Sequence, residues 1–354
     1  MVTYNVSLED KVVLVTGAAG FIGANLVKRL LDEFDSVKVI GIDSITEYYD
    51  VRLKYERLQE LSAYGDRFVF IKDNIAKKEI VESIFTDHHP QVVVNLAAQA
   101  GVRYSITNPD AYIESNLIGF YNILEACRHY GVEHLVYASS SSVYGSNKKV
   151  PYSTDDKVDN PVSLYAATKK SNELMAHAYS KLYNIPSTGL RFFTVYGPCG
   201  RPDMAYFGFT NKLVKGETIK IFNYGNCKRD FTYIDDIVEG MVRIIQHAPE
   251  KQNGEDGLPI PPYKVYNIGN SHPENLLEFV TILQEELVRA GVLSKNYDFE
   301  SYKELVSMQL GDVPVTYADT TPLEQDFSFK PDTSLRDGLR NFAEWYVKYY
   351  NTEK

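Results

Sequence analysis

The sequence predicts an α/β protein in which a doubly wound parallel sheet is joined to a smaller C-terminal domain. Short apolar runs rich in valine and isoleucine alternate with helical patterns through the first half of the chain. This alternation is typical of βαβ units that build a parallel sheet covered on both faces. The 354 residues, 44% of them hydrophobic, are enough to bury such a core. The expected strands are 11–16, 37–42, 67–71, 91–97, 134–140 and 187–193.

After Arg191 the pattern loosens, which predicts a second domain. Loops with glycine and proline lie among shorter elements there. Residues 252–263 are polar and then proline-rich, so we expect a mobile surface loop, to which no function is assigned. The expected limits are 1–193, completed by about 235–270, for the first domain, and 194–234 with 271–354 for the second.

Composition and charge argue against several classes of partner. The formal net charge is −10 and no basic run is present, so we expect no binding to nucleic acid or anionic membranes. No stretch reaches the roughly 18 apolar residues of a membrane span. The N-terminus has no basic segment followed by an apolar one, so we expect a cytoplasmic protein. The three cysteines and seven histidines show no metal-ligand spacing, so we expect reduced thiols and no metal.

A glycine-rich turn follows the first expected strand. Gly17, Gly20 and Gly23 stand in GAAGFIG, between KVVLVT and the helical pattern ANLVKRLLDEF. Glycine in this context allows a tight turn and a close approach of the backbone to a pyrophosphate, and the helix N-terminus supplies amide donors. The spacing is GxxGxxG rather than GxGxxG, so a merely structural turn is the alternative.

Asp43 ends the second expected strand, 20 residues after Gly23. An acid at this place accepts hydrogen bonds from an adenosine ribose and repels a 2′-phosphate, which favours NAD over NADP. The alternative is a solvated acid that begins a loop.

Tyr165 and Lys169 stand four residues apart in a long helical pattern, which puts both side chains on one face. An ammonium beside a phenol lowers the phenol's pKa from about 10, so Tyr165 is a candidate general base. The pair alone can arise by chance in a chain with 27 tyrosines. Together with the glycine turn, the strand order and the serines at 139–142, it is far more specific.

This combination resembles the extended short-chain dehydrogenase/reductases, and within them the nucleotide-sugar 4-epimerases, over nearly the whole chain. The resemblance implies a Rossmann-type NAD-binding domain and a smaller domain that holds UDP. It also implies a homodimer formed through two helices, here around 115–128 and 165–183. The similar segments are TGAAGFIG, LAAQAGVRYS, SNLIGFYNILEACR, SSSSVYG, YAATKK, LRFFTVYGP, GRPDMA, RDFTYIDD and GDVPVTYAD.

The resemblance further implies the roles of individual residues. Tyr165 and Lys169 are the catalytic pair, Lys169 also touches the nicotinamide ribose, and Ser140 with Ser142 lies against O4 of the sugar. The residues expected to bind a tightly held NAD are Gly17, Gly20, Phe21, Ile22, Gly23, Asp43, Asn74, Ile75, Leu96, Ala97, Ala98, Gln99, Asn116, Tyr165 and Lys169. Those expected to bind the UDP-sugar are Arg103, Ser141, Thr194, Arg201, Arg229, Gln309 and Asp312.

The serines distinguish the expected reaction from related ones. Similar 4,6-dehydratases and decarboxylases carry acids immediately before the VYG, where this chain has Ser141 and Ser142. A 4-epimerase needs no second acid. Tyr165 takes the 4-OH proton while NAD+ takes the C4 hydride, the keto-sugar turns over, and the hydride returns to the other face. The alternative is a run of serines that only caps the strand end.

The segment LRFFTVYGPCGRPDMA is most similar to that of the UDP-glucuronate 4-epimerases. Thr194 and Arg201 match residues associated with the sugar carboxylate, and galactose-type enzymes usually have Asn at the position of Thr194. A guanidinium suits this task because it pairs with a carboxylate in a fixed bidentate geometry. A surface arginine in a loop is the alternative.

Two positions, Asn74 and Leu310, depart from the family's pattern, and Gln309 differs from galactose-type relatives. Asn74 replaces the usual Asp before Ile, which removes a charge but leaves an amide for the adenine edge. Leu310 replaces a proline, and Gln309 stands where galactose-type relatives have a phosphate-binding arginine. Arg229 would then carry more of the diphosphate contact.

Other functions stay open at this point. The nearest rivals are a UDP-glucose or UDP-N-acetylhexosamine 4-epimerase and a UDP-glucuronate decarboxylase. A non-catalytic, NAD-sensing protein of the same fold is a rival of another class. The intact Tyr165, Lys169 and Ser140 argue against a sensor, because it needs no base.

Overall fold

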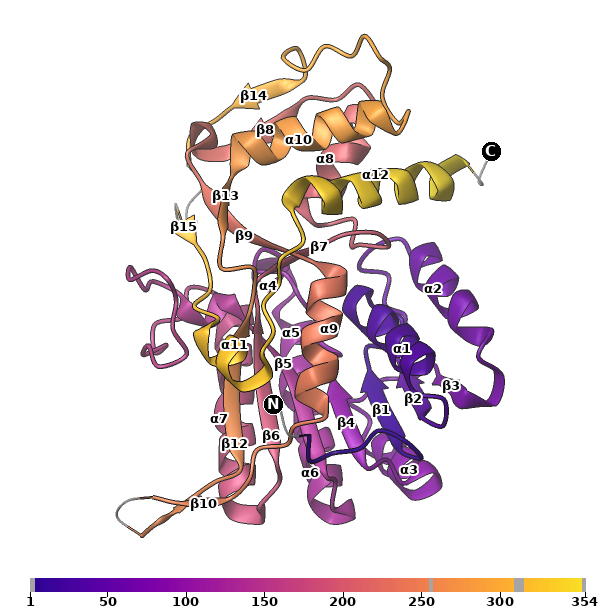
Figure 1. Cartoon of the computed structure of the whole chain (residues 1–354), viewed down its shortest axis with the longest axis vertical. Helices are drawn as coiled ribbons and strands as arrows, with labels where there is room; N and C mark the ends of the chain where they lie inside the picture. Colours follow the sequence, from indigo (N-terminus) through magenta and orange to yellow (C-terminus); the bar gives the residue numbers. More distant parts are fainter. Residues whose placement is uncertain (1–3, 255–256, 309–314, 352–354) are drawn as a thin grey trace.

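A seven-stranded parallel sheet lies at the centre of the computed structural model, which describes residues 4–254, 257–308 and 315–351 (Figure 1). The strand order is β12-β6-β5-β4-β1-β2-β3. This order reverses between β1 and β4, so the carboxyl ends of those strands border the crevice where sheets of this kind bind ligands. The predicted doubly wound parallel sheet is confirmed. Its strands are β1 (Val12–Thr16), β2 (Lys38–Ile42), β3 (Phe68–Ile71), β4 (Val92–Asn95), β5 (His134–Ser140), β6 (Ser187–Phe192) and β12 (Tyr263–Ile268).

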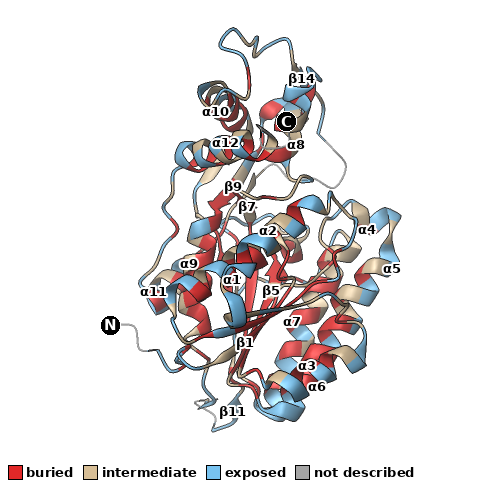
Figure 2. Ribbon diagram, turned by 90° about the vertical axis from the view of Figure 1, so that its right-hand side faces the viewer, coloured by how far each residue is buried: buried red, intermediate tan, exposed pale blue. Residues whose placement is uncertain are grey.

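Helices cover both faces of this sheet (Figures 1 and 2). Successive strand residues point to opposite faces, so Val13 and Val15 pack in one hydrophobic cluster and Leu14 in another. The helical residues of the first cluster come from α1, α2 and α9 and from helices that follow β6, and those of the second come from α3, α6 and α7. The covering helices are α1 (Phe21–Glu33), α2 (Arg52–Ser62), α3 (Lys78–His88), α6 (Gly119–Tyr130), α7 (Leu164–Tyr183) and α9 (Ile234–Ile245).

Helix α7 has clear start and stop signals. The side chain of Ser163 accepts a hydrogen bond from the Ala166 N–H at 3.1 Å, which satisfies one of the free amides at the helix start. Asn184 ends the helix in a left-handed conformation, with φ of 58°. Tyr165 therefore lies in the first turn of a well-capped helix, one turn before Lys169.

A smaller lobe follows β6 and lies beyond the carboxyl ends of the parallel strands (Figure 1). One of its sheets centres on β9, which pairs with β7, β13 and β15, and β8 pairs with β14 in another. The domain limits given above stay a prediction. The lobe contains β7 (Thr194–Tyr196), β8 (Ile219–Ile221), β9 (Lys228–Tyr233), β13 (Pro273–Asn275), β14 (Lys303–Leu305), β15 (Val315–Thr316), α8 (Ala205–Val214), α10 (Leu276–Arg289) and α12 (Leu335–Asn351).

Short elements complete the described chain. The segment 252–263, predicted to be a loop, contains an antiparallel pair of very short strands. No described helix is long and apolar enough to cross a membrane. The short elements are η1 (Gly65–Arg67), α4 (Tyr104–Thr107), α5 (Pro109–Tyr112), η2 (Ile113–Ile118), η3 (Ser141–Tyr144), η4 (Phe222–Gly225), β10 (Gln252–Asn253), β11 (Pro259–Ile260) and α11 (Thr321–Phe327).

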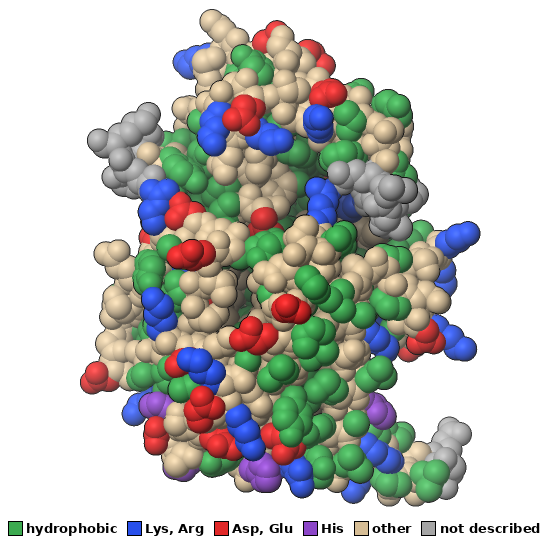
Figure 3. Space-filling model, turned by 180° about the vertical axis from the view of Figure 1, so that it is seen from behind, with side chains coloured by type: hydrophobic (Ala, Val, Ile, Leu, Met, Phe, Trp, Pro, Cys, Tyr) green, Lys and Arg blue, Asp and Glu red, His purple; other side chains and the backbone are tan. Residues whose placement is uncertain are grey.

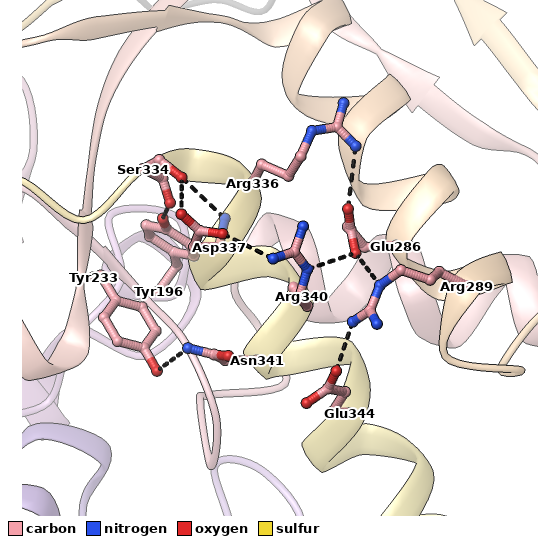
Figure 4. A network of polar contacts seen from close by, with 10 residues as sticks. All are labelled: Tyr196, Tyr233, Glu286, Arg289, Ser334, Arg336, Asp337, Arg340, Asn341 and Glu344. Atoms are coloured by element: carbon pink, nitrogen blue, oxygen red, sulfur yellow. Dashed lines mark hydrogen bonds and ion pairs between the residues drawn. The ribbon is translucent and has the colours of Figure 1, made fainter.

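An ion network holds α10 against α12 (Figure 4). The side chain of Glu286 on α10 is 3% exposed and pairs with Arg289 at 2.6 Å, Arg336 at 3.1 Å and Arg340 at 3.5 Å. Burial opposes ionisation of Glu286, but its arginine partners outweigh burial and keep its pKa below the ordinary value. The amide of Asn341 donates to Tyr233 at 3.1 Å, which joins α12 to β9. These contacts join α10, α12 and β9 within the smaller lobe.

Candidate active site

The glycine turn between β1 and α1 leaves no room for side chains. Gly17 adopts a left-handed conformation, with φ of +71°. A Cβ atom on Gly23 would lie 2.2 Å from the Gly17 carbonyl oxygen, and one on Gly17 would lie 2.9 Å from the Ala97 nitrogen. The turn therefore brings backbone amides and the α1 N-terminus close to any ligand above it, which fits a pyrophosphate. The predicted residues Gly17, Gly20, Phe21, Ile22 and Gly23 all lie in this turn or in the first turn of α1.

Asp43 follows β2 at the same edge of the sheet. Its side chain is buried, and Oδ1 accepts hydrogen bonds from the Ile45 N–H at 2.8 Å and from Lys54 Nζ at 3.1 Å. Among the described residues Oδ2 has no partner, so it is available to a ribose. Lys54, which sequence reasoning missed, compensates part of the charge that was expected to repel a 2′-phosphate.

Asn116 fixes the loop that follows β4. Its Oδ1 accepts from the Gln99 N–H at 2.8 Å, and its Nδ2 donates to Gln99 O at 3.1 Å and to Thr168 Oγ1 at 3.0 Å. Both amide hydrogens are thus used, and the residue is 1% exposed. Asn116 therefore joins the loop to α7. The predicted cofactor residues Leu96, Ala97, Ala98 and Gln99 form this loop, beside the glycine turn.

Asn74 has protein partners at the position where the sequence predicted an adenine contact. Its Nδ2 donates to Glu114 at 2.9 Å, and its Oδ1 accepts from the Ala76 N–H at 2.9 Å. Ile75 beside it is buried in the cluster that packs on α3 and α6. One hydrogen of the Asn74 amide is left for a ligand.

Tyr165, Lys169 and Ser140 come together at the carboxyl end of β5. Ser140 is the last residue of β5 and donates a hydrogen bond to the Tyr165 phenol. Its Oγ also accepts from the Ser142 N–H at 3.1 Å. Lys169 Nζ donates to the Ala138 carbonyl at 2.9 Å. One helix and one strand end thus supply a phenol, an amine and a hydroxyl.

Burial dominates the electrostatics of this group. It raises the pKa of Tyr165, although the hydrogen bond from Ser140 and the charge of Arg201 oppose the shift. Burial also lowers the pKa of Lys169 to about 8. The prediction that Lys169 brings the Tyr165 pKa below 10 is therefore wrong when only the protein's own groups act on the phenol. Burial destabilises the phenolate more than the Ser140 hydrogen bond and the Arg201 charge stabilise it. The cation that acts on the phenol is Arg201.

A buried ion pair supports the strand end from behind. Glu173 on α7 and Arg191 on β6 are 3% and 4% exposed. Arg191 Nε and Nη2 donate to the two Glu173 oxygens at 2.8 and 2.9 Å, and Ser139 donates to Glu173 at 2.6 Å. Burial opposes the ionisation of Glu173, but Arg191 keeps its pKa below the ordinary value. The first of the four serines is therefore structural, which leaves Ser140, Ser141 and Ser142 for a ligand.

We expect Glu173→Gln to lower the free energy of unfolding by about 3 to 5 kcal/mol, because it leaves the buried Arg191 charge without its counter-charge. Urea unfolding followed by circular dichroism measures this. Glu344→Gln is the matched control, since Glu344 is 47% exposed where it pairs with Arg289, and it should cost less than about 1 kcal/mol. Equal losses of unfolding free energy in the two variants would contradict the claim that the buried Glu173 stabilises the fold.

Arg201 is held by an acid of its own loop. Its Nε donates to Asp203 Oδ1 at 3.0 Å, and its Nη2 donates to Oδ2 at 2.5 Å. The Tyr48 phenol donates to the same Oδ2 at 3.2 Å. Burial disfavours the charged guanidinium, but Asp203 outweighs burial and raises the pKa of Arg201. Among the described residues Nη1 has no partner, so Arg201 can receive a second carboxylate on that side.

The other residues predicted to bind the sugar nucleotide come from both lobes. The guanidinium carbon of Arg103, which precedes α4, lies 5.9 Å from the ring centroid of Phe222 in η4. Arg229 lies on β9, and Thr194 begins β7. Gln309, Leu310 and Asp312 lie outside the described residues. Within the described ranges, no group of three or more His, Cys, Asp or Glu residues could hold a metal.

The sequence model of the NAD dependent epimerase/dehydratase family matches residues 13–269. The chain belongs to this family. The matched range begins in β1 and ends just after β12, so it includes the glycine turn, Asp43, the Tyr165 and Lys169 pair, and Arg201. The resemblance inferred from the sequence is confirmed.

Several members of the epimerase/dehydratase family are similar along their whole length. Protein CapI of Staphylococcus aureus is 51% identical over 344 residues, 96% of this chain and 99% of CapI. A probable UDP-glucuronate 4-epimerase of Rhizobium meliloti is 43% identical over 347 residues, 95% and 97% of the two chains. The crystal structure of UDP-glucuronic acid 4-epimerase from Bacillus cereus, in complex with UDP-glucuronic acid and NAD, aligns with a TM-score of 0.81 and 31% identity. It covers 96% of this chain and 100% of that one.

Sequence reasoning missed three polar residues of this family member, Lys54, Tyr48 and Asp203. Asp203 had a local signal, because an acid two residues after Arg201 can fold back on the guanidinium. Lys54 and Tyr48 had none, since each meets its partner only through the tertiary fold. Tyr112 was also missed. Its ring packs edge-on against the Tyr165 ring, with centroids 6.0 Å apart.

Proposed function

We propose that this protein catalyses NAD-dependent epimerisation of a UDP-sugar at C4, converting UDP-glucuronate to UDP-galacturonate through a transient 4-keto intermediate. One observation carries the proposal. The phenol of Tyr165 and the guanidinium of Arg201 lie close enough for the charge of one to act on the other. A base for the 4-OH and a partner for the neighbouring carboxylate thus converge. The similarity to UDP-glucuronate 4-epimerases supports the same substrate.

In the proposed reaction, each side chain of the site has a separate role. Bound NAD+ supplies a hydride acceptor for C4 and a positive charge, and it fits the glycine cradle described above. Tyr165 takes the proton of the 4-OH and gives it back on the other epimer. Ser140 donates to Tyr165 and so can align O4 with the phenol. Ser141 and Ser142 offer no acid for an elimination, which favours epimerisation over dehydration.

A panel of UDP-sugars, with products identified by NMR, tests the proposal. Conversion of UDP-glucuronate to UDP-galacturonate without loss of carbon dioxide is the expected result. A preference for UDP-glucose or a UDP-N-acetylhexosamine would instead establish the galactose-type alternative. Release of carbon dioxide as the main outcome would indicate a decarboxylase, and bound NAD without turnover would indicate a sensor.

We expect the purified protein to carry NAD and to need little or none added, because the cofactor is regenerated within each turnover. The buried Asp43, with Oδ2 open to a ribose, supports this choice. Denatured protein should release NAD(H) in roughly stoichiometric amount, measured by enzymatic cycling of the supernatant. Release of NADP, or full dependence on added NADP, would contradict the role of Asp43.

We also propose a homodimer in the cytoplasm. Figure 3 shows hydrophobic side chains gathered on the face opposite to the view of Figure 1. Exposed apolar residues of η2, α6 and α7 include Ile118, Tyr121, Leu174 and Leu182, on the helices that the resemblance assigns to the interface. Covering these side chains in a second copy removes apolar surface from water. The mass in solution, measured by light scattering, tests the dimer.

A further inference from the structure

Arg57 connects the glycine turn to the loop that carries Arg201. It lies on α2 and is 4% exposed. Its Nη1 donates to the Ala19 carbonyl, in the glycine turn, at 2.9 Å. Its Nη2 donates to the carbonyls of Cys199 at 2.6 Å and Gly200 at 3.1 Å. One planar group thus spans two loops that are about 180 residues apart in sequence and that serve different ligands.

The charge of Arg57 has only neutral acceptors among the described residues. Besides the three carbonyls it donates to the Tyr49 hydroxyl at 3.0 Å, and its guanidinium carbon lies 5.9 Å from the centroid of the Tyr49 ring. Its Nε is buried and has no partner within the described part of the chain. A buried cation without a counter-charge is costly for a fold. This cost is offset if an anion binds at the adjoining turn, where the pyrophosphate fits.

We propose that Arg57 is a positioning residue that fixes the position of the Arg201 loop relative to the NAD-binding turn. In this way it fixes how the sugar carboxylate lies relative to the place where the C4 hydride is exchanged. The inference rests on the proposed function only in assigning the carboxylate of a hexuronate to Arg201. Four acceptors from three segments meet a single guanidinium fork, which neither a lysine nor a neutral amide can reproduce.

Hydrogen exchange of the NAD-loaded protein tests the tether without any sugar. In Arg57→Gln the amides of residues 197–204 should exchange about tenfold faster, because their carbonyl anchors are lost. Peptides from β4 and β5 should be unchanged. Arg67→Gln is the matched control, since Arg67 also donates to backbone carbonyls, Leu31 at 2.9 Å and Phe34 at 3.0 Å, but at the far end of α1. Unchanged exchange of 197–204 in Arg57→Gln would overturn the proposal.

A double-mutant cycle with Arg201→Gln then separates positioning from general stability. With Arg201 present, Arg57→Gln should raise the KM for UDP-glucuronate by about tenfold, and without Arg201 by less than about twofold, because a positioning residue acts through its target. A merely structural role would give the same loss in both backgrounds and would overturn the proposal. Arg67→Gln should leave KM unchanged in both.

The two tests keep this inference distinct from the proposed function. If the parent protein prefers UDP-glucose, the hexuronate assignment fails, and the exchange experiment still decides whether Arg57 holds the loop. If the parent prefers UDP-glucuronate while the cycle is additive, the proposed function stands and the role of Arg57 fails.

Discussion

Tyr165→Phe is expected to slow C4 epimerisation by about 10² to 10⁴ fold, because it removes the phenol that we propose takes the 4-OH proton. The phenylalanine ring keeps the edge-on contact with Tyr112, so fold and bound NAD should be retained. The variant loses the hydrogen bond with Ser140 as well, but a serine hydroxyl alone is a poor base at neutral pH. Initial rates on UDP-glucuronate, read by NMR or chromatography, measure the effect.

Tyr179→Phe is the matched control for this experiment. Tyr179 lies on the same helix and donates to Glu125 at 2.7 Å, away from Ser140 and Lys169. Its loss should leave the rate within about twofold, since a single hydrogen bond away from the proposed site affects mainly stability. Activity of Tyr165→Phe within a few-fold of the parent, with NAD still bound, would mean that another group is the base.

Arg201→Ala is expected to cost about 2 to 5 kcal/mol on UDP-glucuronate, as is typical when one partner of a charge-assisted pair in a site is removed. The 4-keto form of a glucuronate is a β-keto acid. It loses carbon dioxide readily when the carboxylate can align its C–C bond with the carbonyl π system. An epimerase must hold the carboxylate out of that alignment, and Nη1 of Arg201 is the donor left for this purpose. The variant should therefore also release some 4-keto-pentose.

Both proteins should be assayed on both UDP-glucuronate and UDP-glucose. UDP-glucose has no carboxylate, so the parent should use it poorly and Arg201→Ala should be little worse. Because Asp203 is left without its cation in the variant, Asp203→Asn combined with Arg201→Ala controls for that unpaired charge. An equal loss on the two substrates, or a parent that prefers UDP-glucose, would refute the carboxylate contact.

Much of the central fold could be predicted from local sequence. Parallel strands that are buried on both faces read as continuous apolar runs, and the expected 134–140 coincides with β5 (His134–Ser140). The glycine turn was predictable because only glycine tolerates the close approach at Gly17 and Gly23. The short ladder within 252–263 was missed, since strands of two residues leave no periodic signal.

The sequence by itself determined the chemical groups of the site and their local order. Tyr165 and Lys169 share a helix face at a spacing of four residues, and Ser140 ends an apolar strand, so both placements follow from local geometry. The glycine turn and Asp43 follow in the same way from their positions at strand ends.

Only the tertiary structure decided which distant groups meet and how they titrate. The contacts of Arg57 with Cys199, of Tyr48 with Asp203 and of Glu173 with Arg191 join segments that no local pattern relates. The pKa of Tyr165 was predicted in the wrong direction for a related reason. Spacing shows that Lys169 is near, whereas the desolvation that raises this pKa is a sum over every atom that excludes water from the phenol, and that sum exists only once the chain has folded.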